Sequence, residues 1–310
     1  MRRKGHHLMR KAALKRLPLI TRDRPGPSSK FGTMDIVIFI ILTLFALSII
    51  FPFYYLFVVS ITPQHIYANN PSLLWTPEIS FEAYKNVIAD KNIWNGLGIT
   101  CILLFGGTAY QMFFTVITGY ALSRKDWLGK NFVMNMILVT MFFGGGLIPY
   151  YQLIKMLGMM DTIWVMIIPG AIDTFNMLLM RNYFASLPKE LEESARVDGA
   201  NDIQIFVKIF LPLSLPMLAT VGLFFAVGNW NSWYNSMLFN KSENIRTLQH
   251  VLQQIIVTQS SAIPNPHPEK TNTESLKMAA IFFTILPMMC FYPFLQRYFV
   301  KGIDVGAIKG

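Results

Sequence analysis

The stretch IVIFIILTLFALSIIFPFYYLFVVSI, residues 36–61, carries no charged side chain. A helix that crosses a bilayer needs about 20 mainly apolar residues, because about 30 Å of hydrocarbon is crossed at about 1.5 Å per residue. The apolar core of a cleaved signal peptide is only about 7–15 residues long, so we expect this stretch to stay as an anchor. The stretch therefore predicts a membrane protein.

The residues before this stretch are strongly basic. Residues 1–30 contain ten Lys or Arg and one Asp, a net charge of +9. The 310-residue chain has 27 Lys and Arg against 17 Asp and Glu, a net charge of +10, so the rest of the chain sums to +1. A nucleic-acid-binding protein spreads its basic residues over a folded face, whereas these precede an apolar run. They indicate contact with membrane lipid and no nucleic-acid partner.

The overall composition excludes several other classes. The chain is 53% hydrophobic and 14% charged, against about 25% charged residues in soluble domains. Cys101 and Cys290 lie in separate apolar stretches, and the five histidines are scattered over the tail and loops. We therefore expect neither a disulfide framework nor a metal site.

Six stretches are apolar enough and long enough to span a bilayer. They are approximately Ile36–Ile61, Leu97–Ser123, Phe132–Ile154, Ile163–Met180, Leu213–Ser236 and Met278–Leu295. The predicted fold class is an all-α polytopic membrane protein with six transmembrane helices.

The distribution of Lys and Arg sets the expected orientation, because basic residues are retained on the cytoplasmic side. The tail and the segments 124–131, 181–212 and 296–310 together carry 20 basic residues. The opposite segments, 62–96, 155–162 and 237–277, carry 7. Both termini are therefore expected in the cytoplasm of a bacterium, with the chain in its inner membrane.

The chain is predicted to have a basic tail (1–33) and one membrane domain (34–310). The outer loop 237–277 contains apolar residues at helical spacing, which predicts an amphipathic helix outside the membrane. These residues are Leu248, Val251, Leu252, Ile255 and Ile256.

The inner loop 181–212 is longer than a connection between spans requires. Pro188 and the acidic residues after it favour the first turn of a helix, and Gly199 favours its left-handed end. Asn201 or Asp202 is suited to cap a second helix. The second helix is predicted to have an apolar stripe of Ile203, Phe206, Val207 and Phe210 and to stop near Pro212. Two short helices joined by a sharp turn form a knob suited to a groove on another protein.

The spacing in this loop resembles that of a known family. Glu193-Ser194-Ala195, Gly199 and Ile209-Phe210-Leu211-Pro212 match the EAA loop, E-A-A-x3-G-x9-I-x-L-P, of permease subunits of binding-protein-dependent ABC importers. Ser194 in place of the first alanine is the sole departure. Three other segments resemble the carbohydrate branch, the maltose-type and LplC-like polysaccharide permeases. They are GGGLIP at 144–149, residues 178–184 with 188–193, and QRYFVKG at 296–302.

The resemblance implies the type I ABC importer permease fold, with the loop docked on a separate ATPase. The residues it implies for coupling are Glu192, Glu193, Ser194, Ala195, Asp198, Gly199, Ile209, Leu211 and Pro212. Glu192 or Glu193 could pair with basic groups of the ATPase. The implied partners are a second and different permease subunit, two ATPase subunits and an extracytoplasmic solute-binding protein.

The chain itself is expected to bind no cofactor and to be no enzyme. It lacks the G-x4-G-K-[ST] phosphate-binding loop, so ATP and Mg are expected on the partner ATPase. The triple glycine 144–146 is expected to serve helix packing or helix breaking instead. The implied cargo is a sugar, either an oligosaccharide or a polysaccharide fragment.

Sugars are held by hydrogen-bonding and aromatic side chains, so polar and aromatic residues within the spans are candidates for the substrate pathway. The end of the fifth stretch, 229–235, is rich in both. We select Trp230, Asn231 and Tyr234 there. The alternative for the aromatic residues is an interfacial belt at the membrane edge.

Asp173 is the only acidic residue inside a predicted span. A carboxylate there costs about 3 kcal/mol on insertion scales, so it should face a cavity or a partner. Pro169-Gly170 can interrupt the helix before it, and Asn176 lies three residues further on. Asp173 and Asn176 either line the pathway or form a strut between helices. A negatively charged uronate would be repelled by Asp173, so an acidic substrate counts against the pathway role.

A second function from another class stays open from the residues alone. Asp173 could serve as the proton site of a stand-alone secondary transporter. Such a protein would lose uptake with the proton gradient and would need no ATPase.

Overall fold

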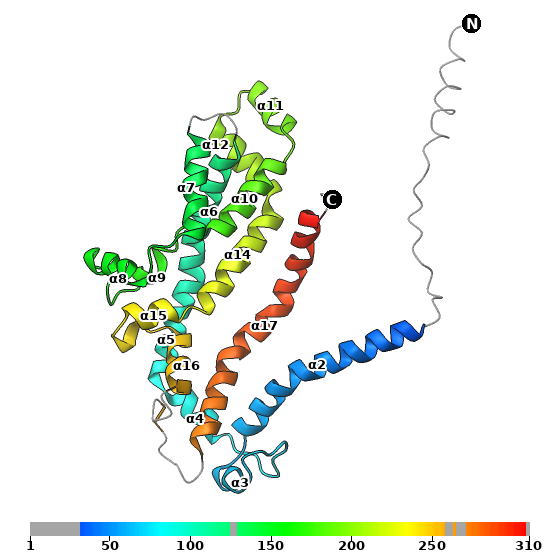
Figure 1. The fold of residues 1–310 in the computed structure, drawn as a ribbon, viewed down its shortest axis with the longest axis vertical. Helices are drawn as coiled ribbons and strands as arrows, with labels where there is room; N and C mark the ends of the chain where they lie inside the picture. The colour runs from blue at the N-terminus through cyan, green and yellow to red at the C-terminus, as the bar shows by residue number, and fades with distance from the viewer. Residues whose placement is uncertain (1–31, 125–128, 258–262, 265–270, 308–310) are drawn as a thin grey trace. The chain divides into compact units, whose positions relative to one another are not determined.

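The computed structural model describes residues 32–124, 129–257, 263–264 and 271–307, with the side chains of the last helix described only to Cys290. The predicted tail 1–33 therefore lies outside the described residues except for its last two. The described residues are helical and contain no strand (Figure 1). The chain divides into two compact units, 1–53 and 54–310.

The first apolar stretch forms α2 (Thr33–Ser60), a helix of 28 residues. At about 1.5 Å per residue it is about 42 Å long, enough to cross the hydrocarbon core. The second stretch lies in a continuous helical segment of 33 residues. This segment consists of α5 (Lys91–Ile102), the π-helical η1 (Leu103–Gly107) and α6 (Thr108–Ser123).

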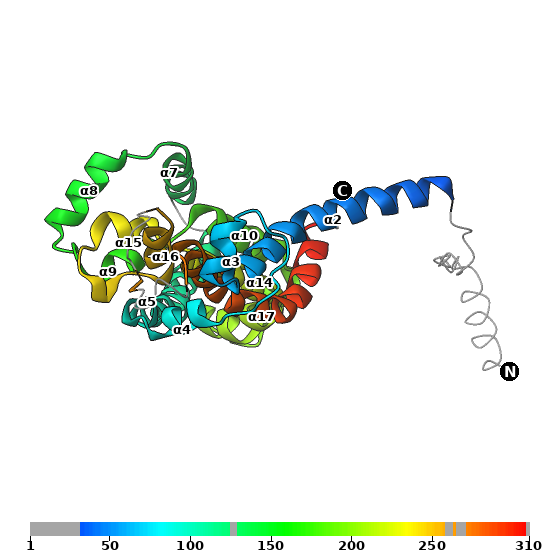
Figure 2. The same ribbon diagram turned by 90° about the horizontal axis from the view of Figure 1, so that it is seen from below.

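The third predicted span is not one straight helix. Instead, α7 (Lys130–Phe142) and α8 (Leu147–Met156) meet at 115° across the triple glycine. Gly146 has φ +84°, a conformation that costs glycine little and other residues more. Each glycine also lowers helix stability by about 1 kcal/mol relative to alanine. The triple glycine therefore breaks the helix, and Figure 2 shows α8 leaving the direction of α7.

The fourth predicted span is interrupted as well. The chain forms the short α9 (Trp164–Ile167), leaves the helix through Pro169-Gly170 and re-enters it as α10 (Thr174–Ser186). The predicted interruption is confirmed, and α10 runs six residues beyond the predicted end at Met180.

The fifth and sixth stretches lie in α14 (Leu215–Trp230) with α15 (Tyr234–Phe239), and in α17 (Thr273–Ala307). Within the described residues, three helices are long and apolar enough to cross a membrane, or five if each sharply bent pair counts as one span. The all-helical class is as predicted, and the count of six spans stays a prediction.

Helices α6, α10 and α14 pack side by side in the 54–310 unit (Figure 1). Gly119 of α6 allows the close approach of α10. A Cβ atom at Gly119 would lie 3.0 Å from the Met180 Cβ and 3.2 Å from the Arg181 nitrogen. The backbone of α10 can therefore approach α6 only because residue 119 has no side chain.

Replacing Gly119 with Leu is expected to destabilise this packing, because overfilling a tight contact costs about 1–3 kcal/mol. The measurement is the thermal unfolding midpoint of the detergent-purified complex. Gly98→Leu is the matched control, because a Cβ atom there meets nothing within 4 Å. Equal shifts for both variants would contradict the close contact of α6 with α10.

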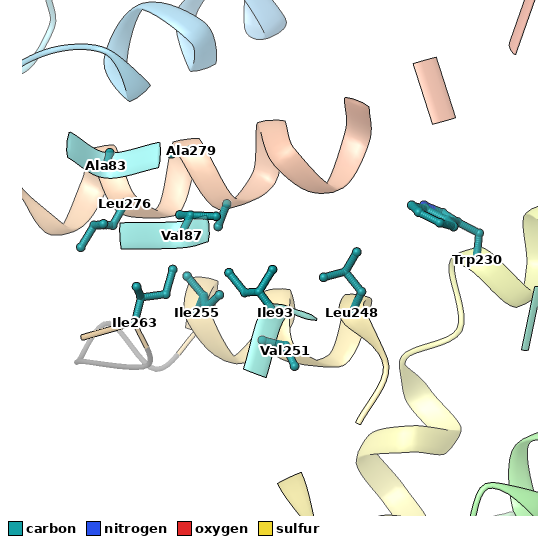
Figure 3. Close-up of a cluster of buried hydrophobic side chains, with 11 residues drawn as sticks. Ala83, Val87, Ile93, Trp230, Leu248, Val251, Ile255, Ile263, Leu276 and Ala279 are labelled. Atoms are coloured by element: carbon teal, nitrogen blue, oxygen red, sulfur yellow. The ribbon is translucent and has the colours of Figure 1, made fainter. Parts of the chain in front are cut away.

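The end of the unit opposite α11 (Glu190–Val197) and α12 (Asp202–Ile205) contains α3 (Gln64–Asn69), α4 (Glu82–Ala89) and α16 (Leu248–Val257) (Figure 1). The short η3 (Glu243–Ile245) precedes α16 in the chain. The predicted amphipathic helix is confirmed as α16. Its Leu248, Val251 and Ile255 are buried against α4, α5 and α17 (Figure 3), whereas Ile256 is exposed.

Candidate translocation cavity and coupling loop

A cavity of about 520 Å³ lies beside α6, the interruption between α9 and α10, and the junction of α14 with α15. Its polar lining comes from Gln111, Asp173, Asn176, Asn229, Asn231, Ser232 and Asn235, and its aromatic lining from Phe224, Phe225, Trp233 and Tyr234. Segments up to 124 residues apart in the sequence thus form one polar and aromatic surface. Such a surface can hold a ligand by hydrogen bonds and by stacking.

Four of the five residues selected from the sequence line this cavity: Asp173, Asn176, Asn231 and Tyr234. Trp230 does not, and its assignment is corrected. Its side chain is 4% exposed and packs in the apolar cluster with Leu248 and Ala279 (Figure 3). Successive residues of a helix point about 100° apart, so Asn229 reaches the cavity while Trp230 turns away.

Asp173 caps the N-terminus of α10. Its Oδ1 accepts a hydrogen bond from the Asn176 backbone nitrogen at 2.8 Å. Among the described residues, this hydrogen bond of Asp173 is local to α10 and reaches no other helix. The interhelical strut is therefore disfavoured, and the carboxylate lies at the cavity wall.

Asn176 is 8% exposed, and its side-chain Oδ1 is buried without a hydrogen-bond partner among the described residues. A buried acceptor with no donor costs about 1–3 kcal/mol. Because Asn176 also lines the cavity, a donor supplied by a ligand would remove this cost.

Two residues of the cavity wall, Asn229 and Gln111, were not selected from the sequence. Asn229 donates its Nδ2 hydrogens to Thr108 Oγ1 at 3.0 Å and to Gln111 Oε1 at 2.9 Å. Gly107 makes room for this amide, since a Cβ atom there would lie 3.2 Å from Asn229 Nδ2. The signal was present for Gln111, because an amide inside an apolar span needs a polar partner.

The predicted two-helix knob is present in the inner loop. Helix α11 (Glu190–Val197) ends at a turn in which Gly199 has φ +83°. Asn201 then caps α12 (Asp202–Ile205) through a reciprocal pair of hydrogen bonds with Gln204, at 2.9 and 3.0 Å. The left-handed Gly199 and the Asn201 cap are therefore confirmed.

The apolar stripe predicted for the second helix is correct for two of its four residues. Phe210 is buried and Phe206 packs against the same cluster, whereas Ile203 is 74% exposed and Val207 is 50% exposed. The helix α12 continues as the π-helical η2 (Phe206–Phe210) before α13 (Leu211–Leu213). A wider helix shifts the periodicity from which the stripe was predicted.

Three apolar residues of the knob are exposed: Val197 on α11, at 88%, and Ile203 and Val207 after the Gly199 turn. We call Val197, Ile203 and Val207 the apolar docking set.

An ion pair joins the two-helix knob to the end of α6. The Arg124 guanidinium pairs with the Glu192 carboxylate and lies 4.3 Å from the centroid of the Phe210 ring. Glu192 also accepts from Arg196 at 3.1 Å, and Arg196 reaches Asp202 at 2.7 Å. The hydrogen bond that Arg196 donates to Glu192 and the negative charge of Asp202 raise the pKa of Arg196 above its ordinary value.

Glu192 is therefore used within the chain, which corrects the expectation that it is free for basic groups of a partner. Its side chain is only 18% exposed. The other residues selected for coupling differ in exposure. Glu193, Ser194, Asp198, Gly199 and Pro212 are exposed, Ile209 and Leu211 are half-buried, and Ala195 is buried.

Comparison with known proteins identifies the family. The profile described as "Binding-protein-dependent transport system inner membrane component" matches residues 130–305. This chain belongs to that family. The protein LplC of Bacillus subtilis (strain 168) is 36% identical over 267 residues, which cover 84% of this chain and 90% of LplC.

Two further relatives agree with this family. The polygalacturonan/rhamnogalacturonan transport system permease protein YtcP of Bacillus subtilis (strain 168) is 35% identical, over 89% of this chain and 98% of YtcP. A solved structure of a bacterial ABC transporter involved in import of the acidic polysaccharide alginate matches with a TM-score of 0.81 and 33% identity. It covers 89% of this chain and 99% of that chain. The type I permease fold and the inner-membrane component are therefore as predicted.

Proposed function

We propose that this permease subunit moves a sugar, an oligosaccharide or a polysaccharide fragment, through the cavity between α6, α10 and α14. The observation that carries the proposal is the lining of the cavity, in which amides and one carboxylate lie beside the aromatic rings of Trp233 and Tyr234. Sugar hydroxyls both donate and accept hydrogen bonds, and sugar rings stack on aromatic faces. Relatives whose names refer to polysaccharide transport support this cargo.

The knob formed by α11, the Gly199 turn and α12 is proposed to dock on a separate ATPase. Its apolar docking set, Val197, Ile203 and Val207, is exposed. Burying an exposed Val or Ile side chain contributes about 1.5–3 kcal/mol to association. ATP and Mg are proposed to bind to that ATPase and not to this chain.

The complete importer is proposed to contain this chain, a second and different permease subunit, two ATPase subunits and an extracytoplasmic solute-binding protein. We propose that both termini lie in the cytoplasm, because Lys and Arg are concentrated in the segments on that side. The basic residues 1–30 then face lipid headgroups, at about 1 kcal/mol for each basic residue near an anionic surface.

ATP-driven closure of the ATPases is proposed to move the knob and tilt the helices that carry the cavity. Arg124 and Glu192 transmit this movement to α6, because their ion pair joins α11 to the end of that helix. Glu193 lies on α11 and is exposed, so of the pair Glu192 and Glu193 it is the one proposed to contact a basic group of the ATPase.

The stand-alone transporter with Asp173 as a proton site is not favoured. The chain belongs to a family of binding-protein-dependent transport components. Asp173 is also engaged as a helix cap, through the Asn176 backbone nitrogen at 2.8 Å.

The test is sugar uptake by proteoliposomes that contain the complex purified in mild detergent. We expect the ATPase to co-purify, and uptake to require ATP and the solute-binding protein and to survive a protonophore. A monomer that takes up sugar without ATP, and stops when the proton gradient collapses, would exclude this function.

A further inference from the structure

The lining of the cavity contains one acidic residue and no basic one. Among the described residues around it, Asp173 is the only Asp or Glu, and none is Lys, Arg or His. A substrate carboxylate entering this surface would lose its water without meeting a cation. Burying a charge without a counter-charge is strongly unfavourable.

Several oxygen atoms at this wall are also available as hydrogen-bond acceptors. Asn176 Oδ1 is buried without a donor. Asn231 donates its Nδ2 to the Val227 carbonyl at 2.9 Å, which leaves its Oδ1 as an acceptor. The Asp173 carboxylate adds two further acceptor oxygens, one of which already accepts from the Asn176 backbone. A sugar hydroxyl can donate to such oxygens, whereas an ionised carboxylate can only accept.

The position that would attract an anion is already filled. The N-terminus of a helix favours negative charge. At α10 this place is taken by the Asp173 carboxylate itself, which caps the helix. A substrate carboxylate would therefore meet a like charge at the N-terminus of α10.

We propose that this cavity selects sugars without carboxylates, with Asp173 as the residue that excludes uronates and Asn176 Oδ1 as the acceptor of a sugar hydroxyl. The inference rests on the proposed sugar-transport function and narrows its substrate class. The proposed preference for sugars without carboxylates distinguishes this chain from relatives whose names refer to polygalacturonan or to alginate.

The experiment measures ATP-dependent uptake of matched pairs of disaccharides by the full complex in proteoliposomes. The pairs are galactobiose with digalacturonate and mannobiose with dimannuronate, whose members differ only in oxidation at C6. The wild type is expected to prefer the neutral member of each pair. In Asp173→Asn, which keeps an N-cap residue and removes the charge, the ratio of uronate to neutral uptake is expected to rise about tenfold, or about 1.4 kcal/mol.

Two further variants complete the test. Asp173→Ser also keeps a capping residue without charge, and it replaces Asp173→Asn if that variant fails to assemble. Glu78→Gln removes an exposed acid in the loop between α3 and α4, and it is expected to leave the ratio unchanged. The comparison with wild type cancels any preference of the solute-binding protein.

A wild type that takes up uronates as fast as neutral sugars would overturn the inference. So would a ratio unchanged by both Asp173 variants. In either case the sugar-transport function would stand. Uptake of no member of the panel would instead contradict the proposed function and the inference together.

Discussion

The double variant Ile203→Asp/Val207→Asp is expected to release the ATPase from the complex. Both side chains are exposed on the segment that follows the Gly199 turn. Losing the burial of two such side chains costs about 3 kcal/mol, which corresponds to an association about a hundredfold weaker. The measurement is the amount of ATPase that stays bound during purification, with the dissociation constant determined by titration.

The matched control is Ile79→Asp. Ile79 is also exposed, at 57%, but it lies in the loop before α4, away from the knob. It receives the same substitution and is expected to leave ATPase binding unchanged. If the double variant bound the ATPase as tightly as the wild type, the apolar docking set would not be the contact.

Replacing Arg124 with Met is expected to cause the second large effect, a loss of stability and of coupling. The variant leaves Glu192, whose side chain is 18% exposed, without its main counter-charge. It also removes the guanidinium from the Phe210 ring and from the Phe184 carbonyl. Breaking a fully buried ion pair on one side costs about 3–5 kcal/mol, and this partly buried pair is expected to cost less than that. We expect a lower unfolding midpoint and ATP hydrolysis that no longer responds to the loaded solute-binding protein.

Two variants separate this ion pair from a general effect of charge. Arg196→Met removes a guanidinium that is 55% exposed and should cost less, because exposed pairs contribute about 0–1 kcal/mol. Arg124→Met/Glu192→Gln leaves no unpaired carboxylate and should recover part of the stability. Equal damage from Arg124→Met and Arg196→Met would show that the Arg124–Glu192 pair has no special role.

Features set by local rules could be predicted from the sequence. Gly199 and Asn201 are examples, because a left-handed turn and a helix cap depend on residues a few positions apart. The exact course of the helices could not. The exposed Val207 lies in a π-helical segment, which no residue pattern in the loop indicated. The break in the third span was suggested by the triple glycine, but no residue pattern gave its angle of 115°.

Some residues of the cavity could likewise be predicted from local rules, and others could not. Asp173, Asn176, Asn231 and Tyr234 could be selected because polar groups inside a span need partners. Trp230 was assigned wrongly, because the sequence does not show which way a helix is turned. The same rule applied to Gln111, but its pairing with Asn229, 118 residues away in the sequence, could be seen only in the structure.

Helix α6 is fastened near its two ends to different segments of the same part of the chain. Near its first residues, Thr108 and Gln111 accept hydrogen bonds from Asn229 of α14. Near its last residues, Tyr120 and the following Arg124 contact Phe210 of η2, which precedes α14 across α13 and a bend of 78°. Sliding α6 along its own axis would break both contacts at once. The 16-residue α6, about 24 Å long, is therefore expected to move together with α14 and η2 and not to slide between them during transport.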